Sequence, residues 1–180
     1  MDRRGVLLIT GISAAGKTTV AELVAGRLDR AVHLRGDVFR RMVVSGRQDM
    51  VPASSADALE QLWLRHKISA MVADEYASAG FTVVMQDVVI GRYLSRMLEV
   101  IVSRPLAVAV LCPGQDAVAM RETERSKTAY AGGGFDIATL DCIFRDETPR
   151  IGVWIDSSDQ TPEETAEEVL DRAWTEGLVA

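Results

Sequence analysis

The sequence predicts a three-layer α/β domain in which five parallel strands form a sheet with helices on both faces. Apolar segments that suit buried parallel strands alternate with segments whose apolar residues recur at helical spacing. A glycine-rich phosphate-binding motif directly follows the first apolar segment. Strictly alternating strands and helices specify a parallel sheet. The expected strands are residues 5–10, 31–35, 81–85, 105–112 and 151–155.

The segment GISAAGKTT, residues 11–19, matches the phosphate-binding pattern G-x-x-x-x-G-K-[ST] at every fixed position. Backbone N–H groups of such a loop, and of the helix that follows, surround a polyphosphate. Lys17 is expected to reach the β- and γ-phosphates, and the Thr18 hydroxyl to coordinate magnesium. A glycine-rich turn without a ligand is the alternative, but the strand before the motif and the helix after it favour the loop. The predicted ATP-binding residues here are Gly11, Ser13, Ala14, Ala15, Gly16, Lys17, Thr18 and Thr19.

Asp37 follows the second predicted strand and opens a short helix. The carboxyl edge of a parallel sheet is where ligands bind, so Asp37 is a candidate site residue that would contact the substrate. Its alternative is a helix N-cap, a role that does not exclude catalysis. Arg40 and Arg41 follow on the same helix and are candidate substrate contacts.

The next long helix is predicted over residues 56–79, after a polar loop over 45–55 that suits a flap above the acceptor. An apolar stripe along this helix is expected to place Trp63 and Met71 in the core. His66 lies within the charged run Arg65-His66-Lys67, so it is expected on a solvated face.

The third predicted strand ends at Gln86-Asp87, at the same edge as Asp37. An apolar strand that ends in aspartate beyond a phosphate-binding loop is the Walker B arrangement, which predicts that Asp87 binds magnesium and borders the substrate. A polar strand end without a function is the alternative. Arg92 opens the next helix, either as a substrate contact or as a surface residue.

The helix after the fourth strand carries Arg121 and Arg125 one turn apart. Two guanidinium groups at this spacing suit a clamp on the phosphates, and both are predicted to be catalytic. Glu122 and Glu124 offer the alternative of a salt-bridged surface helix. The three glycines at 132–134 suit a hinge, so a lid is predicted over approximately residues 121–149 of a single domain, 1–180.

Composition restricts the partners of the protein. The chain has 20 Lys and Arg against 26 Asp and Glu, a net charge of −6, which disfavours broad binding of nucleic acid. No segment approaches the ~20 apolar residues of a membrane span. The two cysteines have no metal-type spacing, which favours a reduced, cytoplasmic setting. We expect a monomer or a homodimer that contacts neither nucleic acid nor membrane.

Taken together, these motifs resemble the small P-loop kinases, most of all the chloramphenicol phosphotransferase type, followed by the gluconate kinase and adenylylsulfate kinase groups. The resemblance runs over nearly the full length. The residues that carry it are those at 11–19, 36–37, 86–88, 121–125 and 154–164. It implies a P-loop kinase fold with a small mobile lid, ATP and magnesium as cofactors, and a loop around residues 157–161 that borders the adenine.

The resemblance also implies a reaction. The γ-phosphoryl group of ATP would pass to a hydroxyl of a small molecule, with Asp37 accepting the hydroxyl proton, Lys17 and both arginines steadying the phosphates, and Asp87 holding magnesium. The acceptor is an antibiotic in one reading, which makes the protein a resistance factor, and a sugar, another metabolite or a nucleoside in a second. A slowly hydrolysing ATP-binding regulatory switch is an alternative of another class.

Overall fold

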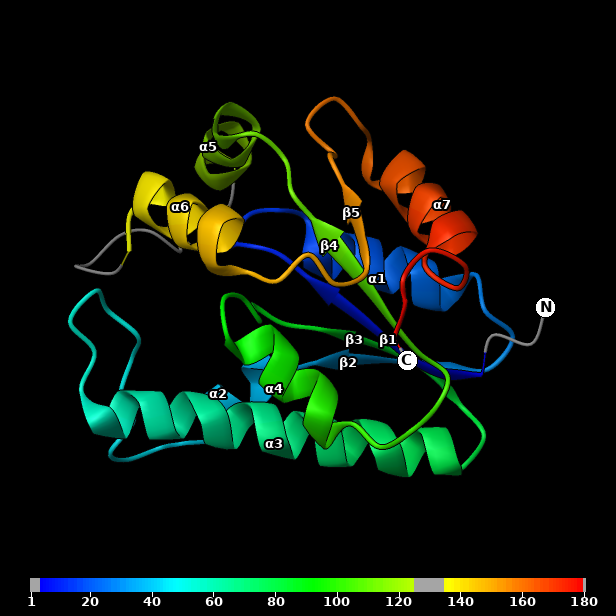
Figure 1. The fold of residues 1–180 in the computed structure, drawn as a ribbon, viewed down its shortest axis with the longest axis horizontal. Helices are drawn as coiled ribbons and strands as arrows, with labels where there is room; N and C mark the ends of the chain where they lie inside the picture. The colour runs from blue at the N-terminus through cyan, green and yellow to red at the C-terminus, as the bar shows by residue number, and fades with distance from the viewer. Residues whose placement is uncertain (1–3, 125–134, 180) are drawn as a thin grey trace.

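The computed structural model describes residues 4–124 and 135–179, and it confirms the predicted parallel sheet. Its parallel strands lie in the order β2-β3-β1-β4-β5 (Figure 1). A short strand that the sequence analysis did not predict, β6 (Leu178–Val179), pairs antiparallel with β4. The parallel strands are β1 (Gly5–Thr10), β2 (Ala31–Arg35), β3 (Thr82–Gln86), β4 (Leu106–Leu111) and β5 (Val153–Ile155).

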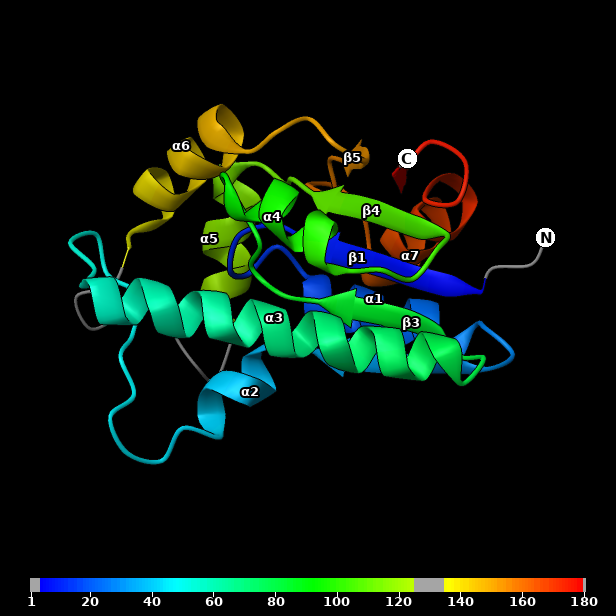
Figure 2. The same ribbon diagram turned by 60° about the horizontal axis from the view of Figure 1, so that its bottom comes forward.

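Helices cover both faces of the sheet, as Figures 1 and 2 show. The third and fourth helices lie on one face, whereas the first and seventh lie on the other and pack against each other. The fifth and sixth helices pack together beyond the carboxyl ends of the strands. The helices are α1 (Lys17–Gly26), α2 (Asp37–Arg41), α3 (Ala56–Ser78), α4 (Tyr93–Val100), α5 (Gln115–Thr123), α6 (Ile137–Glu147) and α7 (Pro162–Arg172).

The two central strands, β1 and β4, are buried along their whole length. They run parallel, with Val6 opposite Leu106 and Thr10 opposite Val110, and β3 flanks β1 on its other side. Strands buried on both faces account for the continuous apolar segments of the sequence. All five parallel strands therefore end at one edge, where the loops after β1, β2 and β3 carry the predicted site residues.

The helix α3 differs from its predicted orientation. The residues it buries are mostly small, so that the helix lies close against its neighbours: Ala58, His66, Ser69, Ala70 and Ala73. Met71 is 68% exposed, and the expectation that it lies in the core was wrong. Trp63 is only half-buried, with the Arg96 guanidinium 4.1 Å from its ring centroid.

The prediction for His66 was also wrong, because this side chain is fully buried. Its ring makes edge contacts with Trp63 and with Tyr93, at centroid distances of 6.3 and 5.7 Å. Helical spacing carried the signal, since His66 lies four residues after Leu62 and seven before Ala73, on the buried stripe. The charged neighbours Arg65 and Lys67 instead led to the prediction that His66 lies on a solvated face.

The predicted lid is only partly within the described residues. Its first residues end α5, and α6 occupies its second half. Arg125 and the three glycines at 132–134 lie outside the described residues. Within the part of the chain that the structure describes, no helix has the length and apolar character needed to cross a bilayer.

Candidate active site at the carboxyl edge of the sheet

The loop between β1 and α1 is shaped for an anion. Gly11 has φ 144°, and a Cβ atom there would lie 2.4 Å from the Leu111 carbonyl oxygen, so only glycine fits. Ala14 has φ 60°, a left-handed conformation that costs roughly 1–2 kcal/mol for a residue with a Cβ atom. Backbone strain of this kind turns successive N–H groups toward one concavity.

The amino end of α1 lacks the capping that other helices of this protein have. In α3, α6 and α7 the side chains of Ser55, Asp136 and Thr161 accept a hydrogen bond from the first turn. Among the described residues, α1 has no such side-chain bond and no acidic residue in its first turn. Its N–H groups and the positive end of the helix dipole are therefore directed at the loop, where a phosphate is the natural partner.

Seven of the predicted ATP-binding residues line one cavity of about 550 Å³. Gly11 is the exception, since it is buried and acts by shaping the loop. The Lys17 ammonium donates a hydrogen bond to the Ile12 carbonyl oxygen at 2.7 Å, which holds it over the loop. Gln160 and Thr165 line the same cavity from the segment after β5, close to where the adenine is expected.

Arg121 reaches this loop from α5. Its guanidinium lies 3.5 Å from the Ala15 carbonyl oxygen and also donates to the Ser157 carbonyl oxygen. The neighbouring Glu122 is buried, with 8% of its surface exposed, so this part of α5 is not an ordinary surface helix. The second predicted arginine of the clamp, Arg125, lies outside the described residues, so the structure does not test the pairing of the two arginines.

Asp37 is the first residue of α2 and lies between two arginines. The Arg41 guanidinium donates to one carboxylate oxygen at 2.5 Å, and Arg35 Nε lies 3.5 Å from the other. Asp37 makes no side-chain N-cap bond for α2, whose N-cap is Gly36. Among the described residues, the Asp37 side chain therefore does not cap α2. Its carboxylate faces the site instead.

Asp87 lies at the end of β3 and is 5% exposed. Arg65 of α3 approaches its carboxylate with two nitrogens, at 3.0 and 3.1 Å, and the Val88 N–H donates to it at 2.8 Å. Arg65 was missed in the sequence because it was read as part of a charged surface run. Its position three residues after Leu62 and three before Ile68 places it on the apolar stripe of α3, which is the available signal.

Gly36 makes room for the Asp87 carboxylate. Its φ of −64° is open to any residue, but a Cβ atom there would lie 2.2 Å from Asp87 Oδ2. Because Gly36 has no Cβ atom, the two loops that carry Asp37 and Asp87 can pack closely together at the same edge of the sheet. The sequence placed both there but gave no sign of this close packing.

This packing yields the first prediction. We expect Gly36→Ala to destabilise the fold by about 1–3 kcal/mol, because the added methyl group displaces a buried, ion-paired carboxylate. The matched control is Gly26→Ala at the end of α1, where an added Cβ atom meets nothing within 4 Å and the free energy of unfolding should stay the same or rise slightly. Urea unfolding of the two variants measures the difference; equal stabilities would contradict the close packing.

The residues present fit a magnesium ion that is held mainly by phosphates. Thr18 and Asp87 line the same cavity as the phosphate-binding loop. Among the described residues there is no cluster of three or more His, Cys, Asp or Glu that would hold a metal by itself. Magnesium is typically bound by one or two carboxylates together with waters and substrate phosphates, which this pair of residues matches.

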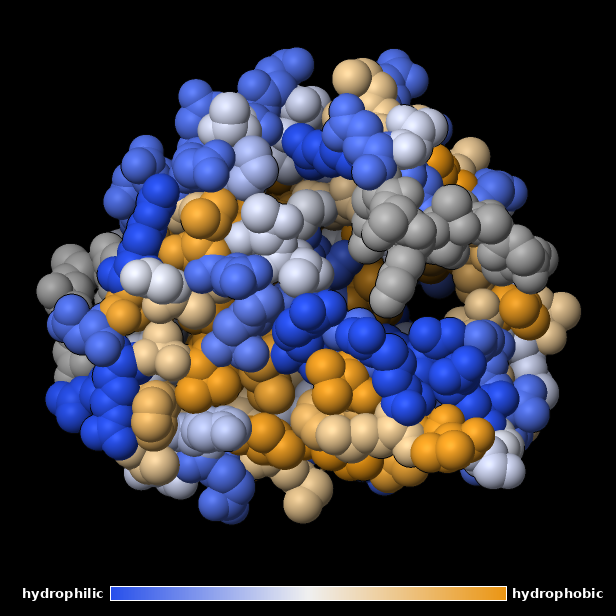
Figure 3. Space-filling model, turned by 180° about the vertical axis from the view of Figure 1, so that it is seen from behind, coloured by the Kyte–Doolittle hydropathy of each residue, from blue (hydrophilic) through white to orange (hydrophobic). Residues whose placement is uncertain are grey.

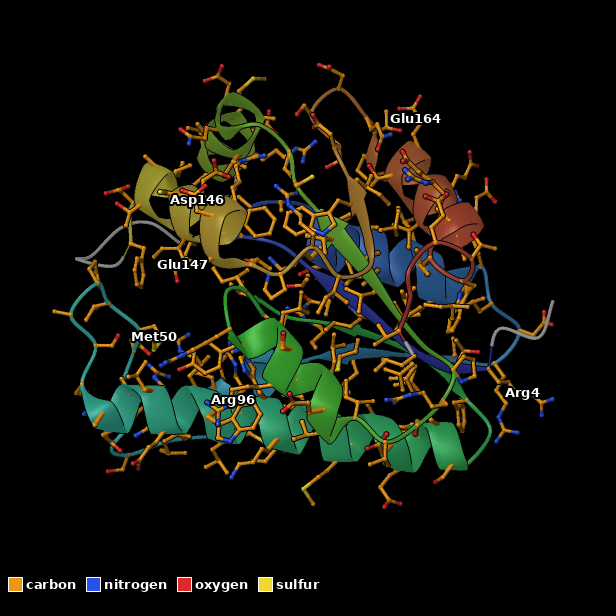
Figure 4. The ribbon with its side chains drawn as sticks, in the orientation of Figure 1. Arg4, Met50, Arg96, Asp146, Glu147 and Glu164 are labelled. Carbon is orange, nitrogen blue, oxygen red and sulfur yellow. The ribbon has the colours of Figure 1, made fainter. Side chains whose placement is uncertain are left out.

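A second cavity of about 940 Å³ adjoins the first, and four residues line both: Ser13, Asp37, Asp87 and Val88. Arg40 and Arg92 line this second cavity as predicted substrate contacts, whereas Arg41 does not and instead contacts Asp37. Figure 4 shows two of its lining residues, Met50 and Glu147, on opposite sides of the space between α3 and α6.

His66, whose ring contacts Tyr93 of the cavity wall, has a pKa far below the usual value for a histidine. Burial is the main cause that lowers the pKa of His66 to about 4; Asp87 raises this pKa, and Arg65 and Arg96 lower it further. An unfolded histidine has a pKa near 6.5. Between these two values the unfolded chain binds a proton that the folded chain does not, so the free energy of unfolding falls as the pH drops from 6.5 toward 4.

We therefore predict that His66 contributes a loss of about 2 kcal/mol of stability between pH 7.5 and pH 5. Replacing it with a side chain that does not titrate, in His66→Leu or His66→Gln, should reduce the acid sensitivity of unfolding by that amount, whatever the variant does to stability at pH 7.5. Urea unfolding of parent and variants at the two pH values gives the comparison. Parallel losses in all three proteins would refute it.

Comparisons with known proteins agree with this architecture. A family model described as an AAA domain matches residues 6–132. A search of curated proteins found no significant match.

The similar solved structures include three that cover nearly the whole chain. A gluconokinase from Sinorhizobium meliloti 1021 has a TM-score of 0.66 and 20% identity, covering 95% of this chain and 92% of that chain. The tunicamycin resistance protein of Deinococcus radiodurans has a TM-score of 0.64 and 14% identity, with coverage of 97% and 98%. The APS kinase CysC of Mycobacterium tuberculosis, solved with AMPPNP and APS, has a TM-score of 0.65 and 18% identity, with coverage of 95% and 98%.

Proposed function

Because the chain belongs to the AAA domain family and has the fold of the small P-loop kinases, we propose that it is an ATP-dependent phosphotransferase. It moves the γ-phosphoryl group of ATP to a hydroxyl of a small molecule. The observation that carries the proposal is the pair of adjoining cavities, which share Asp37 and Asp87. Transfer between two substrates needs two such cavities, whereas a nucleotide switch needs only the first.

The proposed roles follow from the positions of the residues. The loop N–H groups, Lys17 and Arg121 hold the phosphates and neutralise charge on the group in transfer. The acceptor hydroxyl in the second cavity attacks the γ-phosphorus, and the bond from that phosphorus to the oxygen bridging the β- and γ-phosphates breaks. The hydroxyl proton passes to the Asp37 carboxylate, and ADP leaves. Arg125 completes the clamp in this proposal.

A magnesium ion at this site would supply positive charge that offsets the negative charge of the phosphates. Thr18 and Asp87 are the residues that would hold it. Arg65 compensates the negative charge of Asp87 and fixes its orientation at the boundary of the two cavities. An arginine–carboxylate pair of this geometry is already ordered, so the Asp87 side chain loses little conformational freedom when a ligand binds.

Two groups of acceptors are to be compared. A hydroxylated antibiotic would make the protein a resistance factor, and a neighbour in structure is named a tunicamycin resistance protein. A sugar, another metabolite or a nucleoside is the second candidate, and a gluconokinase is among the neighbours.

The experiment is a screen of hydroxylated antibiotics, sugars, sugar acids and nucleosides with the purified protein, ATP and magnesium. We expect ADP release to depend on one class of acceptor, and mass spectrometry to detect the acceptor with one added phosphoryl group. Release of phosphate from ATP at the same rate without any acceptor, with no phosphorylated product, would instead indicate the regulatory switch.

A further inference from the structure

The cavity proposed for the acceptor is large and mostly apolar. Its volume of about 940 Å³ lies at the upper end of the roughly 300–1,000 Å³ usual for pockets that enclose drug-sized ligands. Figure 3 shows the molecule from behind, with an opening where hydrophobic residues (orange) lie next to hydrophilic ones (blue). The wall comes from α2, the loop over 42–55, α3, the start of α4 and α6.

Several apolar residues of this wall belong to the cavity rather than to the core. Nine half-buried apolar side chains line the cavity, yet they are not among the described residues that pack against the hydrophobic core: Val43, Met50, Val51, Leu59, Leu62, Ile68, Val88, Phe135 and Ile143. Each of them leaves apolar surface facing an open space. Exposing apolar surface to water costs about 25 cal/mol per Å² relative to burying it. A ligand that covers this surface recovers that free energy.

The charged groups of the cavity are mostly paired with one another. Arg40 contacts Asp49 through two nitrogens, and Arg65 pairs with Asp87 in the same way. A paired guanidinium has part of its hydrogen-bonding capacity occupied, so it is a poorer partner for a free carboxylate on a substrate.

The amide groups in the wall are also used by the protein itself. Gln61 accepts a hydrogen bond from the Gln48 N–H at 3.0 Å and donates to the Gly46 carbonyl oxygen at 2.9 Å, so it fastens the 42–55 loop to α3. A sugar bound deep in this cavity would therefore leave hydroxyl groups without partners. Each buried, unsatisfied group of this kind costs about 1–3 kcal/mol.

From this lining we infer that the acceptor is an amphipathic molecule, with an aromatic or aliphatic body that fills the apolar cavity and a hydroxyl group at its polar end beside Asp37 and Asp87. The inference rests on the proposed function and sharpens it, because it disfavours free sugars and sugar acids. The polar end of the cavity is the part shared with the phosphate-binding loop, which places the hydroxyl next to the γ-phosphate and the apolar body away from it.

Matched pairs of acceptors test the inference. Hexyl glucoside and glucose carry the same kind of hydroxyl groups, as do phenylpropanediol and glycerol, but only the first member of each pair has an apolar body. We expect kcat/KM with ATP and magnesium to be at least about 10-fold higher for the first member of each pair, since each methylene group contributes roughly 0.8 kcal/mol when it is buried.

Two variants of the cavity wall make the test specific. Leu62→Gln and the milder Leu62→Ala should raise the KM of the amphipathic acceptor about 10-fold while kcat and the KM of ATP stay unchanged, because the lost contact is the same in ground and transition states. The matched control is Met71→Gln on the same helix, an exposed residue outside the cavity. Its acceptor KM should equal that of the parent.

The outcomes separate this inference from the proposed function. Phosphorylation of glucose and glycerol at rates equal to or above those of their apolar partners overturns the inference and leaves the kinase assignment standing. Acceptor KM values that do not change in either Leu62 variant also overturn it. Phosphorylation of no compound, in these pairs or in the wider screen, overturns both.

Discussion

Asp37→Asn is expected to lower turnover by about 100- to 10,000-fold, because the amide that replaces the carboxylate cannot accept the acceptor proton. ATP affinity should change little, since the phosphates are held by the loop and α1 rather than by α2. Steady-state kinetics and calorimetric titration of ATP measure the two quantities. Asn keeps the size of the side chain, so the cavity retains its shape.

The control for this variant is Asp171→Asn, an exposed aspartate on α7 away from both cavities. It should match the parent in turnover and in ATP affinity. Turnover in Asp37→Asn that equals the parent, with ATP still bound, would remove Asp37 from the role of base. The ion pairs with Arg35 and Arg41 would then be its function, as a local anchor for α2.

Arg121→Ala should be comparably damaging, with turnover lowered by about 1,000-fold or more, as for other arginines that stabilise charge on a transferring phosphoryl group. Its guanidinium already lies against Ala15 of the loop and Ser157, so it needs little reorganisation to reach a bound phosphate. Arg121→Lys should recover only part of the activity, because an ammonium group lacks the planar, forked geometry. Kinetics and ATP titration again provide the measurement.

The effect of Arg121→Ala on stability must be measured separately from its effect on turnover, because Arg121 links two loops. Urea unfolding of the variant reports the structural part, and Arg27→Ala, which removes an exposed arginine near Glu167 at the far end of α1, is the matched control. An Arg121→Ala protein with unchanged turnover and ATP affinity would mean that Arg121 only links α5 to the two loops and takes no part in phosphoryl transfer.

The strands and the site edge were predictable because their signals are local. A buried parallel strand needs only a short apolar segment, and a phosphate-binding loop needs glycines, lysine and threonine at fixed spacing. Asp37 and Asp87 followed from strand ends alone, since parallel strands finish at one edge. The short β6 gave no comparable signal, because two residues are too few for a pattern.

The orientation of α3 was not predictable in the same way. Its apolar residues occupy more than one face, and the sequence does not say which face meets the sheet. The structure turns Ala70 and Ala73 inward, and this single choice exposes Met71, buries His66 and brings Arg65 to Asp87. It also turns Leu62 toward the second cavity. Leu62, an apolar residue of this helix, thereby becomes part of the wall of a candidate acceptor site.

The sequence by itself thus determined the parallel α/β fold, the phosphate-binding loop and the edge at which both carboxylates lie, since each depends on residues close together in the chain. Only the tertiary structure decided the strand order, the contact of Arg65 with Asp87, the packing of Gly36 against that carboxylate, and the apolar character of the second cavity. These features depend on which surfaces meet after the helices pack, and the free energy of that packing comes from contacts between residues far apart in sequence.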